Sequence, residues 1–371
     1  MAQQHLDPTD PTAGAVTGDA LAGYLRAQAT EFLRALRLHR ETGGQTAGAE
    51  ESVDAARALR RSARRISASL HTFRPLLDPE WSEEMRPELA WLSGTLGLEH
   101  AYEARLERLL LALHRLSGAA VFPAQAMTTA AVAGGGAPAR AKAGAGQARE
   151  SAGGPAGATV TTDRGNLTVG AAKAGALLER QLTLARTRAH STALQALGSS
   201  RFHAVADKVA VLASEVPLTP AAPATALGPL AAAAEERLTD AVTALPLVTA
   251  GHPYNAEALV HGLSPDPSPH PQDGPWHQVR LLLRLHRYAR EVLHGGNAPV
   301  DVRLLTAGQA LNRHRDASEA AGAAAQAART PRITPATAYA LGVLHADQRH
   351  EVEAARFAFQ QAWQKQTVHA P

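Results

Sequence analysis

The chain has 371 residues, enough for two modest domains or one large one, and its formal net charge is only +3. Hydrophobic residues make up 45% of it but aromatic residues only 4%, which is typical of closely packed helices and unlike a β-sandwich. The small net charge excludes a uniformly basic protein of the kind that coats nucleic acid. The absence of cysteine excludes disulfides, thiolate catalysis and cysteine-based zinc sites.

Helical periodicity runs through most of the chain, and almost no segment alternates with period two. Residues 1–18 are rich in proline, threonine and glycine and are expected to be disordered. The sequence therefore predicts an all-α protein. We expect helices at about 19–41, 51–74, 79–96, 99–116, 167–197, 201–214, 219–244, 276–294, 300–312, 316–328 and 334–364.

The segment 119–165 is dominated by alanine and glycine and indicates a flexible insert, because it cannot bury a core. It divides the chain into a first helical half at 19–118 and a second at 166–366. Each half contains one helix with a stripe of positive charge, and the two stripes share a step pattern, which indicates an internal duplication. We therefore expect two pseudo-repeated helical bundles that pack together.

The stripe of the second half lies in WHQVRLLLRLHRYARE, residues 276–291. His277, Arg280, Arg284 and Arg287 recur there at steps of three, four and three, which places them along one side of a helix. Apolar residues between them supply a face by which the helix can dock. No acidic residue interrupts the run before Glu291, so the stripe carries no counter-charge of its own.

The stripe of the first half lies between residues 55 and 77, which contain six arginines and no aspartate or glutamate. Its steps of three, four and seven again keep the side chains on one side of a helix. Two cationic helix faces in one chain are the main functional signal of this sequence. The first-half stripe comprises Arg57, Arg60, Arg64 and His71, with Arg61 and Arg65 beside them.

With these stripes the chain resembles the CHAD family, a helical domain named for its histidines and built as two related halves. The first stripe ends in the Phe-Arg-Pro-Leu-Leu run at 73–77, and Leu311, His314 and Asp316 match the family's later Leu-Gly-x-His-x-Asp element. The resemblance covers most of residues 19–366 apart from the insert. Arg57 departs from the pattern, because it stands where the family has its first-half histidine.

The resemblance implies non-catalytic binding of inorganic polyphosphate in a basic groove between the halves, with association to polyphosphate granules as a further possibility. Arginine suits this ligand because its forked guanidinium matches phosphate oxygens. His277 and His314 would act as supporting donors. The phosphate contacts implied are Arg57, Arg60, Arg64, Arg65, His71, His277, Arg280, Arg284, Arg287 and His314.

Two other functions stay open. One is a nucleic-acid binder, which the small net charge and the lack of aromatics among the stripes disfavour. The other is a degenerate scaffold that kept the fold and lost the ligand, as the substitutions in the first stripe would allow. No P-loop, Gly-x-Ser-x-Gly or His-Glu-x-x-His motif is present, so we expect no enzyme, cofactor or metal. Lacking a signal-peptide pattern or a long apolar run, the chain is expected in the cytoplasm; its oligomeric state is not specified.

Overall fold

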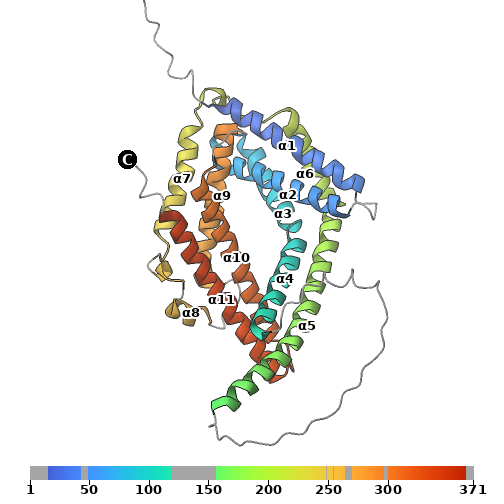
Figure 1. Cartoon of the computed structure of the whole chain (residues 1–371). Coiled ribbons are helices and arrows are strands. Elements are labelled where there is room, and N and C mark those ends of the chain that lie inside the picture. The colour runs from blue at the N-terminus through green and yellow to red at the C-terminus, as the bar shows by residue number, and fades with distance from the viewer. Residues whose placement is uncertain are drawn as a thin grey trace, which may run out of the picture.

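The computed structural model describes residues 16–42, 49–118, 156–247, 249–253, 255–263, 270–295 and 300–364. Within these ranges the regular structure is helical, apart from two isolated β-bridges (Figure 1). The all-α prediction is confirmed. The α-helices are α1 (Gly18–Thr42), α2 (Ala49–Thr72), α3 (Pro79–Thr95), α4 (Leu98–Ser117), α5 (Ala156–Leu197), α6 (Ser200–Ser214), α7 (Gly228–Thr243), α8 (Ala256–Gly262), α9 (Gly274–His294), α10 (Val302–Ala328) and α11 (Pro335–Gln364).

Capping residues fix where several of these helices begin. The Asp78 carboxylate accepts a hydrogen bond from the amide of Trp81 at 2.8 Å, and Pro79 occupies the first turn of α3. Asp301 caps α10 in the same way, through the amide of Leu304 at 3.0 Å. Because these side chains satisfy amides that a helix end leaves unpaired, local sequence is enough to set the start of each helix.

The structure corrects several expected boundaries. Residues 300–312 and 316–328, expected as two helices, form the single helix α10, because His314 between them is buried against neighbouring helices instead of lying in a loop. Helix α7 begins at Gly228 and not near residue 219, and α8 had no counterpart in the prediction. Helix α5 begins at Ala156, inside the expected insert. Residues 119–155 of that insert, and 1–15 of the expected leader, lie outside the described residues.

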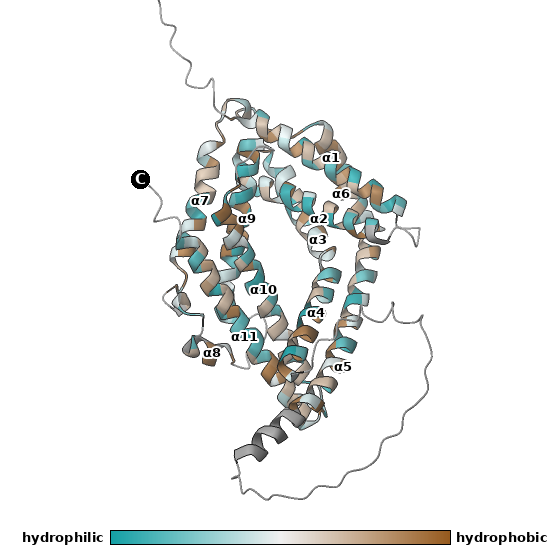
Figure 2. Ribbon diagram, in the orientation of Figure 1, coloured by the Kyte–Doolittle hydropathy of each residue, from teal (hydrophilic) through white to brown (hydrophobic). Residues whose placement is uncertain are grey.

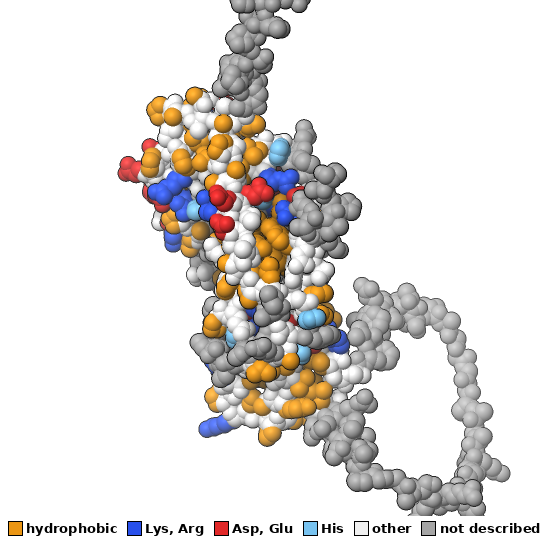
Figure 3. Space-filling model, turned by 90° about the vertical axis from the view of Figure 1, so that its left-hand side faces the viewer, with side chains coloured by type: hydrophobic (Ala, Val, Ile, Leu, Met, Phe, Trp, Pro, Cys, Tyr) orange, Lys and Arg blue, Asp and Glu red, His pale blue; other side chains and the backbone are white. Residues whose placement is uncertain are grey.

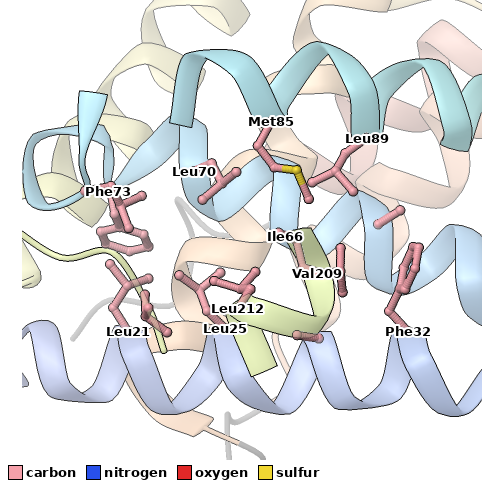
Figure 4. Close-up of a cluster of buried hydrophobic side chains, with 14 of the residues drawn as sticks. Leu21, Leu25, Phe32, Ile66, Leu70, Phe73, Met85, Leu89, Val209 and Leu212 are labelled. Carbon is pink, nitrogen blue, oxygen red and sulfur yellow. The ribbon is translucent and has the colours of Figure 1, made fainter. Parts of the chain in front are cut away.

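A first hydrophobic core lies between α1, α2, α3 and α6 (Figure 4). Leu25 of α1, Ile66 of α2, Met85 of α3 and Leu212 of α6 are all fully buried in it. Burying a side chain of this size stabilises the fold by about 2 kcal/mol. Helix α6 follows the 119–165 segment in the chain, so this core joins helices from both sides of that segment.

Two further cores complete the interior. One joins α7, α9, the start of α10 and the end of α11 around Trp276 and Phe359. The other joins α4, α5, the end of α10 and the start of α11, with Leu178 and Leu341 among its buried residues. Buried alanines such as Ala317 line α10, and such small residues let α11 approach closely. This packing brings α2 against α9, although the two helices lie far apart in the sequence.

The helices carry both polar and apolar residues. Hydrophilic and hydrophobic residues alternate along most helices, as amphipathic packing requires (Figure 2). On the side of the molecule shown in Figure 3, basic and acidic side chains lie next to one another in the upper part, so their charges offset each other there. None of the helices in the described ranges is long and apolar enough to cross a membrane.

Candidate anion-binding site

Five arginines gather where α2, α9 and α10 meet. Arg60 and Arg64 come from α2, Arg280 and Arg284 from α9, and Arg315 from α10. The positive charge of Arg315 lowers the pKa of each of the other four, so all of them lie close enough to Arg315 for their charges to interact. We call these five residues the arginine cluster.

The cluster holds its charges in a partly dehydrated setting. Burial, together with the positive charges of neighbouring cluster members, lowers the pKa of Arg60 to about 10 and that of Arg280 to about 9. Burial is also the main cause that lowers the pKa values of Arg64 and Arg284. Guanidinium groups keep their charge at neutral pH, and like charges at close range repel one another. An anion bound among them would relieve that repulsion.

The four cluster arginines on α2 and α9 form no ion pair with any residue that the structure describes. Arg60 donates from Nε to the carbonyl oxygen of Ser93 at 3.0 Å, and Arg280 donates from Nε to Oδ1 of Asn312 at 2.9 Å. These neutral acceptors orient the guanidinium groups without cancelling their charge. The other N–H groups of these two guanidiniums can therefore donate hydrogen bonds to an oxyanion.

Arg315 differs from the other cluster members because it has acidic partners on its own helix. Its Nη2 lies 2.6 Å from Oδ1 of Asp316, and its Nε lies 3.6 Å from Oε1 of Glu319. Glu319 is also paired with Arg105 of α4. Arg315 therefore links the unpaired arginines of the cluster to a network of ion pairs with Asp316, Glu319 and Arg105.

A cavity of about 250 Å³ adjoins the cluster between α2, α4 and α10. Arg60 and Arg315 line it from the cluster side, Arg105 and Arg108 line it from α4, and two carboxylates of α10 also line it. Gly97, at the corner between α3 and α4, also contributes to the wall. A Cβ atom on Gly97 would lie 2.5 Å from the Arg60 guanidinium, so glycine at this corner leaves that group its room.

The structure brings together only part of the set expected from the sequence. His277 is half-buried beside the cluster, close enough for the charge of Arg280 to act on it, and burial is the main cause that lowers its pKa. His71 is exposed elsewhere on α2, among the charges of Arg86 and other residues outside the cluster. The expected site residues that the cluster contains are Arg60, Arg64, Arg280 and Arg284.

Three other arginines from the expected set lie outside the cluster. Arg57 is exposed and pairs with Asp54 of its own helix at 3.0 Å. Arg65, next in sequence to a cluster member, pairs instead with Glu291 of α9 at 2.7 Å. Arg287 is exposed and lines a separate groove, described below. Each arginine stripe is therefore longer than the part that joins the cluster: Arg57 of α2 and Arg287 of α9 lie outside it.

His314 is buried beneath the site, with 1% of its surface exposed. Its Nε2 accepts a hydrogen bond from Nε of Arg356 at 3.3 Å and lies 3.6 Å from Oδ1 of Asp273. The Trp276 ring stacks on it with centroids 5.6 Å apart, and the His277 ring meets it edge-on at 5.5 Å. Burial, and next the charge of Arg356, lower the pKa of His314 to about 3, so this side chain is neutral at physiological pH.

We expect the wild type to lose more stability than His314→Gln as the pH falls from 7 to 5. In the unfolded chain this histidine takes up a proton near its ordinary pKa of 6.5, whereas in the folded protein its pKa is about 3. Below pH 6.5 the unfolded state therefore binds one more proton, and stability falls with pH by about 1.4 kcal/mol per unit. Urea unfolding at pH 7, 6 and 5 measures the difference, and equal pH slopes for the two proteins would contradict it.

Sequence reasoning missed Arg315. The helix that carries it has no arginine stripe, so the periodicity that identified α2 and α9 gives no signal there. Its position between His314 and Asp316, inside the Leu-Gly-x-His-x-Asp element of the family, is the one feature of the sequence that could have pointed to it. Tertiary packing of α10 against α9 is what adds Arg315 to the other four arginines.

The chemistry of the cluster is that of an oxyanion site. Guanidinium groups are permanently charged, present several N–H donors in one plane, and do not ligate metals. Across the described part of the chain, no group of three or more histidine, aspartate or glutamate side chains is positioned to hold a metal ion. The cluster is therefore suited to bind and orient phosphate-like groups by charge and hydrogen bonds.

The CHAD domain model matches residues 27–325, and the chain belongs to this family. The matched range contains every member of the arginine cluster. Among solved structures, the chain is similar to PptA from Streptomyces chartreusis: the two are 68% identical, the alignment covers 94% of this chain and 100% of that one, and the TM-score is 0.73. The comparison with curated proteins gave no match. The family predicted from the sequence is confirmed.

Proposed function

We propose that this protein binds inorganic polyphosphate through the arginine cluster, without catalysing a reaction on it. Membership of the CHAD family supports polyphosphate as the ligand. The observation that carries the proposal is the gathering of four half-buried arginines from α2 and α9 that have no carboxylate partner among the described residues. Their mutual repulsion opposes the folded state, and a bound polyanion would turn it into attraction.

The chemistry of the ligand matches this arrangement. Polyphosphate carries about one negative charge per phosphate on a flexible chain, so successive phosphates can meet successive guanidinium forks. Arg60 and Arg64 would approach the chain from α2, in the first predicted half of the molecule. Arg280 and Arg284 would approach it from α9, in the second half. In this proposal the basic groove between two related halves lies at the contact of α2 with α9. The proposal also places the protein in the cytoplasm, in association with polyphosphate granules.

A titration with long-chain polyphosphate, single-stranded DNA and ATP, each at two salt concentrations, tests this function. We expect polyphosphate to bind most tightly. Its affinity should fall by about 100-fold between 50 and 200 mM salt, because neutralising four or so cations releases a similar number of counterions. Equal affinity for DNA would favour the nucleic-acid function instead. Absence of polyphosphate binding at low salt would favour the degenerate scaffold.

A further inference from the structure

A second charged depression lies beside the contact between α2 and α9. It has a volume of about 970 Å³ and is lined by α1, α2, the C-terminal half of α9 and the start of α10. We call it the α1–α9 groove. Its basic lining residues are Arg61, Arg65, Arg287 and Arg290, none of which belongs to the arginine cluster.

The carboxylates that line the α1–α9 groove are each already paired. Asp301 caps α10 and accepts a hydrogen bond from Arg290 at 2.9 Å. Glu31 is paired with Arg34 of its own helix. Glu291 is paired with Arg65, as described above.

Two basic side chains of the α1–α9 groove stay uncompensated. Arg61 and Arg287 are both exposed and form no ion pair with any residue in the described ranges. Like the half-buried arginines of the cluster, they carry positive charge that no neighbouring carboxylate neutralises. The groove therefore has free positive charge to offer to an anion.

The α1–α9 groove continues the arginine cluster along both helices. Arg287 lies about one helical turn beyond Arg284 on α9, and Arg61 lies about one turn before Arg64 on α2. Tyr288 lies at the junction: the Arg65 guanidinium is 5.3 Å from the centroid of its ring. Glu291, the first acidic residue of the α9 stripe, occupies the same junction through its pair with Arg65.

The contacts of Glu291 are those that a phosphate would make. Its carboxylate accepts from Nε and Nη2 of Arg65, at 2.7 and 3.3 Å, and from the hydroxyl of Tyr24 at 3.1 Å. Burial and the Glu291 charge raise the pKa of Tyr24, so its hydroxyl remains a donor. The Arg65 and Glu291 side chains keep 23% and 26% of their surface exposed, so solvent reaches the pair. An oxyanion arriving from the cluster would find the same three donors, with Glu291 as competitor.

We propose that the α1–α9 groove is a second anion subsite, which takes the continuation of a long polyphosphate chain, and that Glu291 competes with the chain for Arg65 and Tyr24. This inference rests on the proposed function, because it assumes that the cluster binds the first part of the same ligand. Short chains would occupy the cluster alone. Long chains would gain the contacts of Arg61 and Arg287 and, after displacing Glu291, of Arg65.

The test compares tripolyphosphate with long-chain polyphosphate on the full chain. Arg61→Gln/Arg287→Gln is expected to lower the affinity for the long chain by about 10-fold or more, to reduce its salt slope by about two, and to leave tripolyphosphate affinity within twofold. Glu291→Gln keeps a side chain that can accept from Tyr24 and removes the competing charge. It is expected to raise long-chain affinity several-fold without changing tripolyphosphate affinity.

Arg37→Gln/Arg40→Gln, which removes two exposed charges of α1 that do not line the groove, is the matched control. The subsite is refuted if Arg61→Gln/Arg287→Gln behaves like this control, or if it weakens both ligands equally. It is also refuted if Glu291→Gln leaves long-chain affinity unchanged while thermal unfolding shows a folded protein. Failure of the wild type to bind either ligand would instead overturn the proposed function.

Discussion

Replacing Arg280 and Arg284 with glutamine is expected to weaken polyphosphate binding by about 100-fold and, at the same time, to raise the stability of the unbound protein. Each guanidinium fork contributes on the order of 1.4 kcal/mol to holding a phosphate, and 1.4 kcal/mol corresponds to tenfold in affinity. Stability rises because the two replacements remove like charges from a partly buried cluster in which burial and neighbouring arginines already lower the pKa of Arg280 to about 9.

The opposite signs of these two effects make the result specific. A variant that lost affinity through misfolding would be less stable, whereas this one should unfold at a higher temperature than the wild type in low salt. Asn312, the hydrogen-bond partner of Arg280, is exposed and can bond to water instead. The control is Arg37→Gln/Arg40→Gln, which should change affinity less than twofold. Unchanged affinity in the cluster variant, measured by calorimetric titration, would show that phosphate binds elsewhere.

Asp273→Asn is expected to destabilise the protein by about 3–5 kcal/mol, because it leaves buried charges without their counter-charge. The Asp273 carboxylate is fully buried and lies 2.8 Å from Nη1 of Arg349 and 2.7 Å from Nη2 of Arg356. It also accepts a hydrogen bond from Ser318. One carboxylate thus joins the start of α9 to α10 and α11. Without it, Glu353 is the one acidic partner left to these arginines among the described residues, and it is bonded to Arg356.

The electrostatics of Asp273 agree with this role. Burial alone would raise its pKa, but the hydrogen bond and positive charge of Arg349, together with the Ser318 hydrogen bond and other neighbours, outweigh burial and lower it to about 2. The carboxylate is therefore ionised throughout the usual pH range. Urea unfolding at pH 7 measures the expected loss, with the exposed Asp54→Asn as control, for which a change below about 1 kcal/mol is expected. An Asp273→Asn protein as stable as that control would refute the counter-charge role.

Much of the secondary structure could be predicted because its signals are local. Asp78 with Pro79 marks the start of α3, and the apolar periodicity of α2 and α9 gives both their helical state and the face that docks. The arginine stripes were visible for the same reason, since side chains three and four residues apart share a helix face in any fold. The break expected within α10 was wrong, because His314, in a polar run that resembles a loop, is buried against side chains of α9 and α11.

The sequence by itself determined that this chain would form amphipathic helices and that two of them would carry arginines on one face. Only the tertiary structure decided which arginines act together. Arg64 and Arg65 are adjacent and chemically identical, yet one joins the cluster and the other pairs with Glu291, 226 positions away. Arg315 enters the cluster from a helix without a stripe. The reason is physical: the charge environment of a side chain depends on what lies within a few ångströms of it, and that is set by how α2, α9 and α10 pack against one another.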